Sequence, residues 1–141
     1  MILDRRIRFS RFSIAFLFVA SISANCNNNE SPLASGAQIS LHGRVSVGTY
    51  FDANDHIEKQ YILILNSGIS VSKNEFGGPV KGVTKIQIIP STDRVFRSTS
   101  KLLRKASLSK GRVLAYGKLE YPISDHHHTK VCIELDSLHF E

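Results

Sequence analysis

Apolar and polar residues alternate along residues 39–47, where isoleucine, leucine and two valines point one way and polar residues the other. A period of two residues is typical of a strand that buries one face. Gly43 falls on the apolar side of this strand, where a large residue is expected. Glycine inside a strand often marks a bulge or a sharp bend. We therefore expect a curved first strand; the alternative is a packing gap that the core tolerates.

Two further strands are expected in the first half of the chain. Residues 60–65 are apolar from Tyr61 onward, which indicates a central strand. Residues 66–68 (Asn-Ser-Gly) then favour a turn, before residues 69–71 resume an extended pattern. Residues 83–89 form the next strand, and Pro90 ends it.

The segment 50–58 is polar and predicts a loop between the first two strands. Its Asp and Asn side chains offer oxygen ligands that could bind calcium. Their spacing matches no EF-hand, however, and no glycine lies at the turn. A solvated loop is therefore the interpretation we prefer.

The period changes in residues 94–110, where an apolar stripe recurs at helical spacing. Residues 91–93 (Ser-Thr-Asp) supply N-cap chemistry, and Gly111 is expected to end the helix. The sequence therefore predicts one helix of three to four turns. The stripe consists of Phe96, Thr99, Leu103 and Ala106.

Two strands are expected after the helix, in residues 112–121 and 131–135, with Leu138 and Phe140 packing the C-terminus. The order is then three strands, one helix and two strands. This is the order of an OB-fold, a five-stranded Greek-key barrel with a helix between strands three and four. We therefore predict a mainly β, OB-like barrel over residues 38–141; an open sheet with the helix on one face is the alternative.

The N-terminus has the pattern of an export signal. Four arginines precede the apolar run 12–22, which is shorter than the roughly 20 residues that a membrane-spanning helix needs. Small residues follow and end at Cys26, as in a bacterial lipobox, although Asn25 departs from the usual small residue. We expect a lipoprotein signal peptide over residues 1–25. Cleavage after Ala24 without acylation and a buried N-terminal helix are the alternatives.

An acylated Cys26 would anchor the mature chain in the cell envelope, facing the periplasm or in the outer membrane. Residues 26–37 are rich in Asn, Ser and Gly and predict a flexible tether. The other cysteine, Cys132, lies between valine and isoleucine and is expected to be a buried core residue. A Cys26–Cys132 disulfide in an oxidising compartment is the rival hypothesis.

The sequence also resembles a known family. Residues 111–119 (GRVLAYGKL), the run 126–129 (HHHT) and residues 85–89 (KIQII) are similar to bacterial domain-of-unknown-function family 4431. The resemblance covers roughly residues 39–136. It implies an exported bacterial setting and no defined biochemical role. The insert at residues 122–125 differs from the Gly- and Thr-rich loop associated with that family.

The three histidines of this run are the main candidates for a site. In an extended segment His126 and His128 share one face, and His127 and Asp125 share the other. Neutral imidazoles can bind Zn²⁺ or Cu²⁺, but two ligands are too few, and His42, His56 or His139 would have to complete the set. Alternatively, Thr129 and the histidine rings pin the hairpin through hydrogen bonds to backbone groups. Ligand recognition at the barrel rim is the third alternative.

Basic residues dominate the expected helix, and no acidic residue occurs between Asp93 and Glu120. A solvated helix face is one explanation. The other is an anion site for lipid headgroups or acidic glycans. Nucleic acid is disfavoured because the protein is expected to be exported and no aromatic residues interleave the charges. The anion-binding candidates are Arg97, Lys101, Arg104 and Lys105.

No catalytic motif is present: the sequence has no nucleophile elbow, no HExxH and no phosphate-binding glycine loop. The chain has 141 residues, 42% of them apolar and a net charge of +6, which fits one ordinary globular domain. We therefore expect a non-enzymatic envelope lipoprotein whose domain binds an acidic ligand or an envelope protein. The alternative is a Zn- or Cu-binding module built on His126 and His128.

Overall fold

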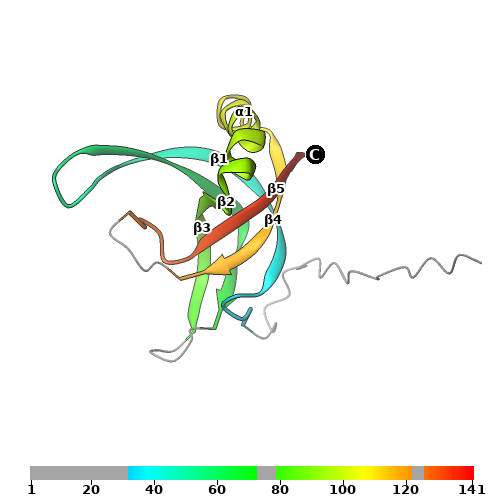
Figure 1. The fold of residues 1–141 in the computed structure, drawn as a ribbon. Helices are drawn as coiled ribbons and strands as arrows, with labels where there is room; N and C mark the ends of the chain where they lie inside the picture. Colours follow the sequence, from blue (N-terminus) through cyan, green and yellow to red (C-terminus); the bar gives the residue numbers. More distant parts are fainter. Residues whose placement is uncertain (1–31, 73–78, 122–125) are drawn as a thin grey trace, which may run out of the picture.

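The computed structural model describes residues 32–72, 79–121 and 126–141. Its strands close into a barrel in the order β1-β2-β3-β5-β4 (Figure 1). Neighbouring strands are antiparallel except β3 and β5, which are parallel. The structure thus confirms the OB-like barrel with a helix between the third and fourth strands. The elements are β1 (Gln38–Phe51), β2 (Ile57–Val71), β3 (Val80–Pro90), α1 (Asp93–Ser109), β4 (Arg112–Glu120) and β5 (Cys132–Phe140).

The bend in β1 at Gly43 closes the barrel. β1 pairs with β4 up to Arg44 and with β2 from Gly43 onward, and Gly43 itself pairs with both Leu65 and Val113. A Cβ atom at Gly43 would lie 2.5 Å from the backbone oxygen of Ile64. Only glycine lets the two strands approach this closely. The expected curved first strand is confirmed.

A second close approach joins β4 to β5. Tyr116 pairs with Ser137 and Gly117 pairs with Leu135, so Asp136 is an extra residue on β5. Such a β-bulge bends the strand and increases its twist. A Cβ atom at Gly117 would collide with the backbone oxygen of Glu134.

The core lies inside the barrel and under α1. Apolar side chains of all five strands meet there, and α1 adds Leu103 and Ala106. The helix packs against β1, β5 and β3 at one end of the barrel (Figure 1). Its polar stripe member Thr99 is buried as well, and its hydroxyl donates a hydrogen bond of 2.7 Å to the backbone oxygen of Val95.

A loop joins the first two strands as predicted, but its predicted bounds of 50–58 are too wide. β1 continues to Phe51 and β2 begins at Ile57, so that only residues 52–56 form the turn. The pairs Tyr50–Glu58 and Phe51–Ile57 extend the ladder, although their side chains are mostly polar or exposed. The hairpin therefore projects from the barrel as a long arm (Figure 1).

The turn predicted at residues 66–68 is wrong, because these residues lie within β2. The ladder with β3 shifts register there: Ile64 pairs with Lys85, and Ile69 pairs with Val83. Four residues of β2 therefore oppose one residue of β3, and β2 bulges instead of turning.

The N-terminal cap of the helix is the predicted one, but the residue that ends the helix differs from the prediction. The Thr92 hydroxyl caps the N-terminus by accepting a hydrogen bond from the Val95 amide. At the C-terminus Lys110, rather than Gly111, adopts the left-handed conformation, with φ of 54°. The Lys110 amide closes the last turn on the Ala106 oxygen.

The last strand is longer than predicted, because Leu138 and Phe140 belong to β5. Residues 33–37 are already bound to the barrel: the Leu33 amide donates to the Ser70 oxygen and the Gly36 amide to the Leu119 oxygen. The signal peptide over residues 1–25 and Cys26 lie outside the described residues. Within the described part, no helix is long and apolar enough to cross a bilayer.

Candidate functional site

Residues 126–129, in the described part of the loop between β4 and β5, lie against β3 and are held there by Gln87. This side chain points outward between the core residues Ile86 and Ile88, yet only 2% of Gln87 is exposed. Its Oε1 accepts a hydrogen bond of 2.8 Å from the backbone amide of His128. Its Nε2 donates one of 3.0 Å to the backbone oxygen of His126. One buried carboxamide thus satisfies two backbone groups of the loop.

Thr129 fixes the same loop from the other side. Its Oγ1 accepts a hydrogen bond of 3.0 Å from the backbone amide of Gln87 and donates one of 2.7 Å to the backbone oxygen of Val131. The expectation that Thr129 pins the hairpin to backbone groups is confirmed.

The rings of His126 and His128 bond to a carboxylate rather than to the backbone. Glu58 lies at the start of β2, and its Oε1 is 2.5 Å from His126 Nδ1. Its Oε2 is 3.2 Å from His128 Nε2. The hydrogen bond from His128, aided by the hydrogen bond and charge of His126, lowers the pKa of Glu58 below its usual value. We name Glu58, His126 and His128 the carboxylate–imidazole cluster.

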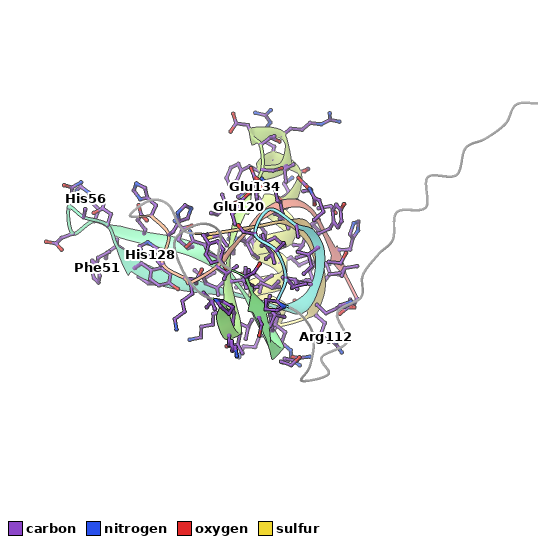
Figure 2. All side chains as sticks on the ribbon, turned by 90° about the horizontal axis from the view of Figure 1, so that it is seen from below. Phe51, His56, Arg112, Glu120, His128 and Glu134 are labelled. Carbon is purple, nitrogen blue, oxygen red and sulfur yellow. The ribbon has the colours of Figure 1, made fainter. Side chains whose placement is uncertain are left out.

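An aromatic pair lies beside this cluster. The rings of Tyr50 and His128 stack with centroids 4.2 Å apart and planes 4° from parallel. A Cβ atom on Gly48 would collide with the Tyr50 ring, so the ring lies over the bare backbone of Gly48. Figure 2 shows His128 alongside the arm, between the barrel and the tip that carries Phe51 and His56.

The tip of the arm is a turn held by Asp52. Its Oδ1 accepts hydrogen bonds of 2.8 Å from the amides of both His56 and Asn54. The hydrogen bond from the His56 amide is the main cause that lowers the pKa of Asp52. Phe51 and Ile57 flank this turn and are 63% and 64% exposed.

A hollow of about 430 Å³ opens next to the Tyr50–His128 pair. It is bounded by residues of the arm, of β3 and of the loop between β4 and β5. Three of the residues that line it are lysines, none is acidic, and none of these lysines forms an ion pair with another described residue. We call this site the lysine hollow. Its main lining residues are Tyr50, Lys81, Lys85, His128, Thr129 and Lys130.

The predicted metal site is not assembled as expected. His42 bonds to Glu141 at 2.6 Å, and so does not join His126 and His128. His56 bonds to Asp52 at 3.2 Å. Among the described residues, no three His, Cys, Asp or Glu side chains are grouped so as to hold a metal ion. Asp125 lies outside the described residues.

His127 points away from the cluster and lines a separate hollow of about 370 Å³ with Cys132, Glu120 and Glu134. Cys132 is buried as predicted, with 1% exposed, but it is not part of the main core cluster. Burial raises the pKa of its thiol to about 11. A thiol with such a pKa is a poor nucleophile at neutral pH.

Sequence reasoning missed Glu58, Gln87 and Tyr50. The sequence predicts a loop at Glu58 and Tyr50, whereas in the structure they form a cross-strand pair on the arm. The position of Gln87 could have been noticed in the sequence, because this polar residue interrupts the apolar run of residues 86–89. The predicted anion-binding residues Arg97, Lys101, Arg104 and Lys105 are all exposed on α1, away from the cluster.

No protein-family model matches the sequence, and no curated protein is similar to it at a significant level. Among solved structures, the chain is similar to a small single-stranded DNA-binding protein from Streptomyces coelicolor, with 16% identity and a TM-score of 0.39. The match covers 76% of this chain and 94% of the other. At this level the likeness concerns the fold alone.

Proposed function

We propose that the chain is an exported lipoprotein whose barrel is a non-enzymatic module that binds an acidic ligand in the lysine hollow. The observation that carries this proposal is the set of three lysines, Lys81, Lys85 and Lys130, around one hollow without a carboxylate partner among the described residues. Like charges that gather without counter-charges favour an anion.

The chemistry of the hollow suits phosphate, sulfate or carboxylate groups. A lysine ammonium donates charge-assisted hydrogen bonds, each of which contributes roughly 1.5–3 kcal/mol. The hydroxyl of Thr129 already bonds to backbone groups, so the lysines supply the recognition. The stacked rings of Tyr50 and His128 form a flat wall on one side.

The size and place of the hollow support the same proposal. Its volume of about 430 Å³ lies within the range of small-molecule sites. In OB-folds, the face of strands two and three, with the loops between strands one and two and between four and five, binds oligonucleotides and oligosaccharides. The hollow takes its residues from β3, from the β1–β2 arm and from the loop between β4 and β5. An acidic glycan fits an exported protein better than a nucleic acid does.

The envelope location is part of the proposal and has its own test. Acylation of Cys26 would anchor the barrel to a membrane after removal of residues 1–25. Intact-mass analysis of protein from a bacterial membrane fraction should show a chain that starts at Cys26 and carries a diacylglycerol adduct. A chain that starts at Asn25 or at Met1 would contradict it.

Ligand binding is tested by calorimetric titration of the chain with tripolyphosphate and with a sulfated disaccharide. The combined change Lys81→Ala, Lys85→Ala and Lys130→Ala should weaken binding by a factor of roughly 1,000 or more, since each lost charge-assisted bond is worth about 1.5 kcal/mol or more. The matched control changes Lys101→Ala, Arg104→Ala and Lys105→Ala on α1, which removes the same charge and should leave binding intact. Equal losses in both variants, or no binding by the wild type, would contradict the proposal.

A transition-metal site is the second candidate, because Glu58 bonds to both His126 and His128, although these three described side chains are not arranged to hold a metal ion as they stand. Two histidines and a carboxylate form one of the known zinc ligand sets. A metal would have to replace the present hydrogen bonds of Glu58. Titration with Zn²⁺ or Cu²⁺ should then release heat that the change His128→Gln removes. Absence of heat at micromolar protein would exclude this candidate.

A further inference from the structure

Helix α1 carries a basic face that the ligand hollow does not use. The helix buries Thr99, Leu103 and Ala106 against the barrel. At about 100° per residue, its five basic residues fall within a sector roughly 100° wide on the opposite side. All five are exposed, and none forms an ion pair with another described residue. The basic face consists of Arg94, Arg97, Lys101, Arg104 and Lys105.

Negative charge is nearly absent from this helix. Asp93, in the first turn, is its one acidic residue. Lys110 follows immediately after the helix and adds positive charge, whereas Arg112 is paired with Glu141. The face from Arg94 to Lys105 therefore presents positive charge without ion-pair partners among the described residues along about 17 Å of helix.

An apolar side chain lies in the middle of the basic face. Leu108 is 76% exposed and, with Lys101, Arg104 and Lys105, lines a shallow depression of about 510 Å³. Phe140 lies beside Lys105, whose Nζ is 5.1 Å from the ring centroid, and this ring is 37% exposed. Cations that surround exposed apolar side chains are typical of surfaces that adsorb to lipid headgroups.

We propose that the basic face of α1 docks on the headgroup layer of an anionic lipid bilayer. A bilayer is flat, and a straight helix that protrudes from the barrel can lay all its cations on it at once (Figure 1). Each lysine or arginine near such a surface contributes about 1 kcal/mol, or about fivefold in affinity. Leu108 would insert among the headgroups. No aromatic residue of α1 lies within the basic sector, and the neighbouring Phe140 ring is already covered by the Lys105 ammonium, which disfavours a single-stranded nucleic acid.

This docking is separate from ligand binding, because the hollow is built by β3, the arm and the β4–β5 loop and not by α1. Figure 1 shows the arm and α1 projecting from the barrel in different directions. The basic face therefore orients the anchored barrel on the membrane without covering the hollow's own lysines.

The test is vesicle sedimentation of the full chain with phosphatidylcholine alone and with added phosphatidylglycerol. The basic and apolar residues 5–22 are expected to bind vesicles in every variant, so the measured quantity is the change, relative to the wild type, in the ratio of the two affinities. The changes Arg97→Gln, Lys101→Gln and Arg104→Gln should lower this ratio by about 100-fold, and raised salt should lower the wild-type ratio. The control Lys81→Gln, Lys85→Gln and Lys130→Gln removes equal charge and should keep it.

A second variant separates insertion from charge. Leu108→Ser leaves the charge unchanged and should weaken binding to anionic vesicles while the salt dependence stays the same. Equal losses in the helix and control variants would show a net-charge effect and overturn the proposal. It would also be overturned if the wild type shows no anionic preference, or if it binds single-stranded DNA through these residues but not vesicles.

Discussion

The side-chain Oε1 of Gln87 accepts a hydrogen bond of 2.8 Å from the backbone amide of His128, and this bond holds the end of the β4–β5 loop against the barrel. The two residues are 41 positions apart in the chain. Because His128 also stacks on Tyr50 and bonds to Glu58, this contact positions one wall of the lysine hollow. The proposed ligand site therefore depends on a buried carboxamide that does not itself line the hollow.

Removal of this amide should release the loop. In Gln87→Leu the His128 amide and the His126 oxygen lose their partner, which should destabilise the protein by about 1–3 kcal/mol. Amide hydrogen exchange at His128 should become faster than in the wild type. The control Gln38→Leu, at an exposed position of β1, should change the unfolding free energy by less than about 0.5 kcal/mol. Protection of His128 that persists in Gln87→Leu would contradict this assignment.

Acid should destabilise the fold through Asp52 and Glu58. Hydrogen bonds lower the pKa of both carboxyls below their ordinary values of 3.8 and 4.5. The unfolded chain therefore binds more protons at acidic pH, and stability rises with pH in that range. The contribution of these two carboxylates to stability is complete above their ordinary pKa values, and it is lost as the pH falls through their lowered pKa values in the folded protein. Urea unfolding across this range should show the slope, and the pair Asp52→Asn and Glu58→Gln should reduce it. An unchanged slope would refute the role of both groups.

The glycine of β4 should tolerate no side chain. In Gly117→Ala the new methyl group meets the backbone oxygen of Glu134, and the bulge at Asp136 must shift. Overpacking of this kind costs about 1–3 kcal/mol. Gly111→Ala is the control, because its methyl group would meet side-chain atoms of Ser109 and Phe140 at 3.2–3.6 Å. Thermal unfolding should show a clearly larger loss for Gly117→Ala, and equal losses would speak against the bulge.

Cys132 should be chemically inert in the folded protein. Its thiol is 1% exposed and has a pKa of about 11 because it is buried. In a Cys26→Ser chain, a thiol reagent at neutral pH should react slowly with Cys132 until urea unfolds the barrel. Fast reaction without urea would contradict the burial of this thiol in the folded barrel.

The barrel could be predicted from the sequence because its signals are local. Alternation, the apolar run of β2, the cap at Thr92 and the glycine in β1 all act within a few residues. The arm could not be predicted, because Asp52, Asn54 and Asp55 read as a loop. What extends the strands is the cross-strand ladder, and a single sequence does not display such pairing.

Only the loop residues of the candidate site could be predicted from the sequence, and their partners on the strands could not. The three histidines and Thr129 stood out as a run, but their partners come from distant strands. Glu58 is 68 residues from His126, and only closure of the barrel brings the two side chains together. The lysines of the hollow are scattered over β3 and the loop and form no motif. The apparent metal pair was instead found to bind a carboxylate.

The most direct test of the account is an amide chemical-shift titration of the isotopically labelled chain with tripolyphosphate. If the ligand binds in the lysine hollow, the largest amide shifts should occur in Tyr50, in residues 81–85 and in residues 128–130, which line it. Shifts confined to residues 94–110 of the helix, or no saturable shifts at all, would contradict an acidic-ligand site in the hollow.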